Sequence, residues 1–150
     1  MKTKWMILLL AMLLTACDTL YGLRRYATVA ELPPPAELRA KIEQLPEVQK
    51  VEYRHTQGGR PVTLRGVQTP EDIHSFSYSG TNAVRGTLQF IVDYTGKVRY
   101  QQTLLGMGRP PPQAWIDSTQ PVMLKIEAIL ERDYGLHLRD SVEEDRHGVK

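Results

Sequence analysis

The residues of this chain that could do chemistry are few, and the four histidines are the first to consider. His55, His74, His137 and His147 are spread along the sequence, and none has a second ligand at the spacing of a zinc site. Asp72 lies two residues before His74 and could orient its imidazole for proton transfer. This pair supports one enzymatic hypothesis, a cell-wall hydrolase, which also needs a nucleophile in the same cleft. The alternative for His55 and His74 is a partly buried structural role.

Other reactive side chains form no catalytic pattern. Ser75, Ser77 and Ser79 occupy alternate positions, as on the polar face of a strand, and the sequence has no Gly-x-Ser-x-Gly motif. The glycines of residues 106–109 lack the Lys-Ser/Thr pair of a phosphate-binding loop. The sequence therefore predicts no catalytic, cofactor-binding or metal-binding residue.

The single cysteine, Cys17, follows a segment typical of protein export. Lys2 and Lys4 form a short basic region, and residues 5–14 are all apolar. That run is shorter than the ~20 residues that a spanning helix needs. Residues 14–17 read Leu-Thr-Ala-Cys. This order of charge, apolar run and tetrapeptide resembles the lipobox of bacterial lipoproteins.

The resemblance implies a signal peptide over residues 1–16 and a lipidated Cys17. In bacterial lipoproteins the signal is cut before the cysteine, which is diacylated on sulfur and usually gains a third acyl chain. Each buried CH₂ then contributes about 0.8 kcal/mol to anchoring. The expected location is the periplasmic side of the bacterial cell envelope. Asp18 resembles an inner-membrane retention signal, but the choice of membrane stays open. The alternative is an uncleaved N-terminal anchor.

Composition limits the class of partner. The chain carries 19 Lys and Arg against 17 Asp and Glu, and cleavage before Cys17 would remove Lys2 and Lys4 and leave a neutral balance. No basic excess is available to neutralise phosphates, which argues against nucleic acid as a partner. The 41% hydrophobic and 24% charged residues are typical of a globular protein.

The sequence divides into a tether, a domain and a tail. Residues 17–35 are expected to be the lipidated cysteine and a tether, because three consecutive prolines at its end favour an extended chain. Arg24 and Arg25 in this tether are either solvated or in contact with anionic headgroups. Its apolar residues Leu20, Tyr21, Leu23 and Tyr26 leave open that part of the segment packs on the domain. Residues 36–142 are expected to form an α+β domain, and residues 143–150 a charged, frayed tail.

The first part of the domain is predicted to be a short helix followed by a hairpin. Leu38 and Ile42 lie four residues apart on one stripe of a helix over residues 36–45. Gly58-Gly59 is typical of a two-residue hairpin turn, and it would pair Tyr53 with Leu64. Residues 73–79 are predicted to form a further strand.

A second hairpin and a long helix complete the predicted domain. Asp93 to Gly96 fits a type I turn that would pair Val92 with Val98. A helix is expected over residues 113–134 and ends at Gly135, with Pro121 either kinking it or starting its main part after a cap at Ser118 or Thr119. Residues 136–142 could add an edge strand. The fold class is α+β: a short N-terminal helix, about five antiparallel strands, and the long C-terminal helix on one sheet face.

Residues 84–129 show a further resemblance. They run strand, Asp-x-x-Gly-x-Val, strand, Gly/Pro break and helix, and residues 136–142 could supply a last strand. This order resembles the C-terminal domain of TonB-type periplasmic proteins, which pair with partners through sheet edges. The strands upstream and the N-terminal anchor depart from that family, and no functional residue is transferred.

Three functional hypotheses follow. The first is a non-enzymatic envelope lipoprotein that binds a protein or cell-wall partner through exposed aromatic side chains of the sheet. The second is a carrier of lipid or glycan in a cavity lined by residues such as Phe90, Tyr100, Met123 and Ile126. The third is the hydrolase built on His74. The residues expected to contact a partner in the first hypothesis are Tyr53, His55, Tyr78 and Tyr100.

Overall fold

The computed structural model describes residues 20–64, 67–107, 112–136 and 143–147. Within these residues the chain forms two helices and six strands. In chain order they are β1 (Leu20–Val29), α2 (Pro35–Glu43), β2 (Val48–Leu64), β3 (Val67–Gly80), β4 (Arg85–Val92), β5 (Val98–Met107), α3 (Gln113–Tyr134) and β6 (Glu143–His147).

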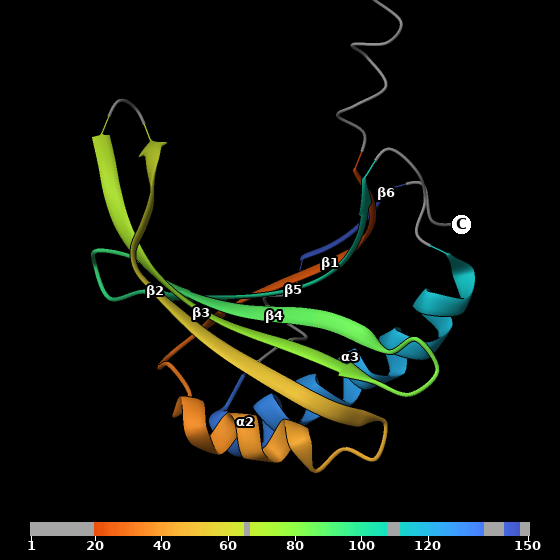
Figure 1. Ribbon diagram of the computed structural model, residues 1–150. Coiled ribbons are helices and arrows are strands. Elements are labelled where there is room, and N and C mark those ends of the chain that lie inside the picture. Colours follow the sequence, from red (N-terminus) through yellow and green to blue (C-terminus); the bar gives the residue numbers. More distant parts are fainter. Residues whose placement is uncertain (1–19, 65–66, 108–111, 137–142, 148–150) are drawn as a thin grey trace, which may run out of the picture.

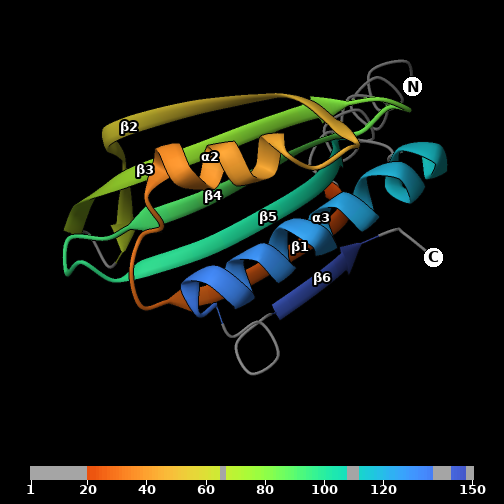
Figure 2. The ribbon, with the colours of Figure 1, turned by 90° about the horizontal axis from the view of Figure 1, so that it is seen from below.

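The six strands make one antiparallel sheet in the order β2-β3-β4-β5-β1-β6. Both helices lie on the same face, with α2 beneath β2 and β3 and α3 beneath β1 and β5 (Figures 1 and 2). This arrangement confirms the predicted α+β class and the packing of the long helix against the sheet. The sheet has one strand more than the five expected.

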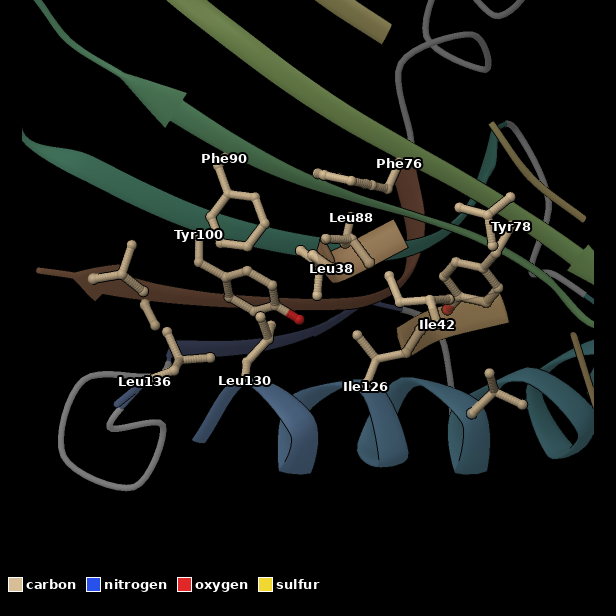
Figure 3. Packing of buried hydrophobic residues seen from close by; sticks show 14 of the residues in the cluster. Leu38, Ile42, Phe76, Tyr78, Leu88, Phe90, Tyr100, Ile126, Leu130 and Leu136 are labelled. Carbon is tan, nitrogen blue, oxygen red and sulfur yellow. The ribbon is translucent and has the colours of Figure 1, made fainter. Parts of the chain in front are cut away.

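The core lies between the sheet and the two helices. Alternate residues of β3, β4 and β5 point into it, and Leu38 and Ile42 of α2 meet them from below (Figure 3). Helix α3 contributes Ile126 and Leu130. A strand places every second side chain on one face, so the intervening residues lie on the open face away from the helices.

Helix α3 runs unbroken from Gln113 through Pro121. The predicted alternative start after Thr119 is wrong, because the Thr119 hydroxyl accepts a hydrogen bond from the backbone N–H of Arg85 at 3.1 Å rather than capping the helix. The predicted end is confirmed: Gly135 has φ 65° and its N–H donates to the carbonyl of Leu130.

The second predicted hairpin is confirmed in turn and register. The N–H of Asp93 donates to Lys97 at 3.0 Å, the N–H of Gly96 donates to Asp93 at 2.9 Å, and Gly96 has φ 81°. Val92 pairs with Val98 as expected. The left-handed residue at the turn fixes this register from the local sequence.

The predicted hairpin at Gly58-Gly59 is wrong. Strand β2 continues through both glycines and pairs with β3, so that Tyr53 lies opposite Phe76 rather than Leu64. Gly58 has φ 59° and lies where the register shifts, as expected at a bulge. Pairing with β3 places Tyr53 against a buried aromatic ring, which the local turn could not offer.

The predicted tether and tail are also wrong for most of their length. Residues 20–29 form β1, which pairs with β5 along its whole length, and Ala27 and Val29 are buried. Residues 143–147 form β6, the edge strand beside β1. The strand expected over residues 136–142 lies, apart from the buried Leu136, outside the described residues.

Candidate functional site

Three of the candidate residues predicted from the sequence lie side by side on β2 and β3. Tyr53, His55 and His74, here called the ring cluster, lie on the face of the sheet that carries the helices. His55 pairs with His74 across the two strands, and their rings stack with centroids 4.3 Å apart and planes 10° apart. The Tyr53 hydroxyl lies 2.8 Å from Nδ1 of His74. The cluster is therefore one connected surface of three rings.

The ring cluster is joined to the core at one side and exposed at the other. The ring of Tyr53 contacts that of Phe76, a fully buried residue, with centroids 5.0 Å apart. Tyr53 itself is 36% exposed, and His55 is exposed as well. A ring held on one side and open on the other suits binding, because little side-chain entropy is lost when a partner covers it.

Burial shifts the pKa of two groups in the ring cluster. Partial burial, and then the positive charge that His55 can carry, lower the pKa of His74, and the carboxylate of Asp72 opposes this shift. Burial raises the pKa of the Tyr53 hydroxyl. Both groups are therefore held neutral at pH 7.

The arrangement around Asp72 does not build the catalytic pair expected from the sequence. Its carboxylate accepts a hydrogen bond from the N–H of Gly58 at 2.9 Å and lies 4.0 Å from Nε2 of His55. His74 instead has Tyr53 as its hydrogen-bonding partner. Among the described residues, no three His, Cys, Asp or Glu side chains are arranged to hold a metal ion.

The nearby serines are on the other face of β3. Ser75 accepts a hydrogen bond from the amide of Gln89 at 3.1 Å, and Ser77 shares one with Thr87 at 3.3 Å. These bonds link β3 to β4 across the open face. The hydroxyls therefore point away from the ring cluster and cannot supply it with a nucleophile.

A hollow adjoins the ring cluster where α2 passes beneath β2. It has a volume of about 580 Å³. Its lining is partly small or apolar, and it includes the ion pair of Arg39 with Glu43, 2.8 Å apart. The residues that line it are Pro35, Ala36, Arg39, Ala40, Glu43 and Tyr53. A hollow that combines apolar residues with a paired charge suits one large side chain of a partner.

A second hollow, of about 570 Å³, lies on the open face of the sheet and is mainly polar. Arg39 and Tyr53 line both hollows. The other residues of the second hollow are Lys50, Val51, Glu52, Arg54, Ser75, Ser77, Thr87 and Gln89. The two hollows thus flank the same stretch of β2.

That stretch is at the edge of the sheet. Strand β2 is the first in the strand order, and no described strand pairs with its outer side (Figure 2). An unpaired strand edge carries backbone donors and acceptors that can pair with another chain. The ring cluster and both hollows therefore lie beside a surface that can add a strand.

Tyr78 and Tyr100, which were expected to contact a partner, are in the core. Their side chains are fully buried, because Tyr78 lies over Gly86 and Tyr100 packs on Phe90 with centroids 5.6 Å apart. The prediction of a docking role for these two tyrosines is wrong.

The residues expected to line a carrier cavity also fill the core. Phe90, Tyr100, Met123 and Ile126 are all fully buried. Neither hollow beside the ring cluster is lined by any of them. These four residues therefore provide packing rather than a binding cavity.

Sequence reasoning missed the contribution of α2. Ala36 and Ala40 lie four residues apart on the exposed side of this helix, and this spacing of small residues was the available signal.

Comparisons with protein-family models, curated proteins and solved structures give no match. No helix among the described residues is long and apolar enough to cross a membrane. The function of the site is therefore inferred from its geometry.

Proposed function

We propose that the protein is a lipid-anchored component of the bacterial cell envelope that acts as a non-enzymatic binding module. Cys17 carries the acyl chains, and the domain lies on the periplasmic side of a membrane. Its partner is an envelope protein, which presents an extended segment to the outer edge of β2. The lipobox at residues 14–17 supports the anchor.

The observation that carries the binding role is the position of Tyr53. This half-exposed ring belongs to the ring cluster, lines both hollows and lies on the edge strand. A tyrosine in such a place supplies a large contact area at small entropic cost. A bound strand would pair with the backbone of β2 and place one of its side chains in the hollow above α2.

The charges beside the edge favour a protein strand over a strongly charged ligand. Lys50 and Glu52 form one ion pair beside the edge and Arg39 and Glu43 form another, while Arg54 adds one positive charge.

The test is cross-linking of the native protein in its own membranes, followed by identification of what is captured. We expect a reproducible protein neighbour that is lost with Tyr53→Ala. Tyr94→Ala is the matched control, because Tyr94 is 70% exposed in the turn between β4 and β5, away from the cluster. Capture that survives Tyr53→Ala and His55→Ala, or retention of a glycan in place of a protein, would contradict the proposal.

The anchor is tested separately. We expect the mature N-terminus to be acylated Cys17 in the mass spectrum, and Cys17→Ser to release the protein from membranes. A mature chain that keeps residues 1–16 would contradict lipidation and favour the uncleaved anchor.

A further inference from the structure

We propose that the bilayer surface lies against the end of the sheet at which β1 begins, where Trp115 and Arg85 contact the lipid headgroups. This orientation rests on the proposed lipid anchor at Cys17. It deepens that proposal by naming the surface of the domain that meets the membrane.

The first argument is the short distance between the anchor and the fold. Residues 18 and 19 alone separate Cys17 from Leu20, the first residue of β1. Three steps of 3.8 Å between Cα atoms span at most about 11 Å. An acylated Cys17 therefore holds the start of β1 within about 11 Å of the membrane surface. A tether over residues 17–35 would have allowed a much greater distance between the membrane and the domain.

Several other elements share this end of the sheet. Leu20 pairs with Met107 at the end of β5, and Gly22 pairs with His147 at the end of β6. Helix α3 begins nearby at Gln113, and Figure 2 shows its first turns beside the same end. The bilayer must therefore face this end of the domain rather than the opposite one.

The second argument is the chemistry found there. Trp115, in the first turn of α3, is partly exposed and packs against Leu104, which pairs with Leu23 of β1. The indole N–H donates to the carbonyl oxygen of Arg85 at 2.8 Å, and the Arg85 guanidinium lies 5.6 Å from the ring centroid. Tryptophan favours the headgroup layer, and an exposed arginine can bind phosphate there.

The opposite end is held away from the bilayer. Strand β5 has ten residues, which at about 3.3 Å each span roughly 33 Å. Beyond its start lies the turn that carries Tyr94 (Figure 1). His74 pairs with Phe90 in the half of β4 nearer to this turn, so the ring cluster is presented toward partners in the periplasm.

The experiment uses the lipidated protein in phosphatidylcholine–phosphatidylglycerol vesicles that contain brominated lipids, which quench tryptophan in contact with them. Cleavage before Cys17 removes Trp5, so Trp115 is then the one tryptophan of the chain. We expect brominated lipid to cause a loss of Trp115 emission. The control combines Trp115→Phe with Tyr94→Trp, which moves the reporter to the opposite end, and its emission should not change.

Each outcome decides the orientation. Quenching of Trp115 without quenching at position 94 supports it. Equal quenching at both positions, stronger quenching at position 94, or none at Trp115 in vesicle-bound protein overturns the orientation and leaves the anchor intact. Protein that fails to float with the vesicles overturns the anchor, and the orientation with it. If the control variant does not fold, the presence or absence of Trp115 quenching in the wild-type protein still tests the orientation.

Discussion

Arg25 of β1 forms an ion pair with Glu127 of α3, with 3.0 Å between Nη1 and Oε2. The Glu127 side chain is 3% exposed, so this carboxylate is buried between sheet and helix. It also accepts a hydrogen bond from the Tyr100 hydroxyl at 3.3 Å. The pair joins the N-terminal strand to the long helix and makes residues 20–29 part of the folded unit.

Arg25→Ala should destabilise the domain by about 3 kcal/mol, because it leaves a buried carboxylate without its cation. The measurement is the free energy of unfolding from a urea titration. Arg39→Ala is the control: Arg39 is half-exposed and pairs with Glu43 on one helix, so its loss should cost less than about 0.5 kcal/mol. Equal losses in the two variants would show that β1 is not anchored through this pair.

The parts of the fold that local sequence specifies could be predicted. The turn at Asp93 to Gly96 fixes the register of β4 and β5 through one left-handed glycine, and Gly135 ends α3 in the same way. Both signals act within a few residues, so they need no knowledge of the rest of the chain.

The parts that depend on distant partners could not be predicted. The alternating pattern around Tyr53 fits Leu64 or Phe76 as a partner equally well, and only the burial of Phe76 selects β3. The segment that forms β1 precedes three prolines and lacks a regular alternation of apolar and polar residues, so it resembles a linker until β5 pairs with it. The residue types of Tyr53, His55 and His74 mark them as candidates, but the hollow beside Tyr53 forms only where α2 packs beneath β2, a contact between segments that local sequence does not specify.

Two buried tyrosines should respond differently to loss of the hydroxyl. Tyr100→Phe should cost about 1–2 kcal/mol of unfolding free energy, because Gln102 and Glu127 lose the hydrogen bond that the buried Tyr100 hydroxyl offers them. Tyr78→Phe should be close to neutral, since the buried Tyr78 hydroxyl makes no hydrogen bond with the described residues. Thermal or urea unfolding of both variants checks the contrast, and a larger loss for Tyr78→Phe would contradict it.

Gly86 is required for the packing of Tyr78. A Cβ added at Gly86 would overlap the phenol oxygen and ring of Tyr78, which is buried and cannot move aside. Gly86→Ala should therefore cost about 2–3 kcal/mol of unfolding free energy through overpacking. Gly135→Ala is the comparison: its Cβ meets open space, so only the left-handed backbone opposes it, at about 1 kcal/mol. An equal cost at both positions would mean that Tyr78 can repack.

The ring cluster should make stability depend on pH. Burial and the neighbouring His55 hold the pKa of His74 below its usual 6.5, so the unfolded chain protonates this residue first as pH falls. The unfolded state then binds more protons, and unfolding free energy should decrease from about pH 6.5 downward until the folded His74 also titrates. Urea midpoints at about pH 7.5 and about pH 5 measure this, above the range where the carboxylates titrate. His74→Gln should reduce the difference, and an unchanged difference in His74→Gln would assign the pH dependence to another group.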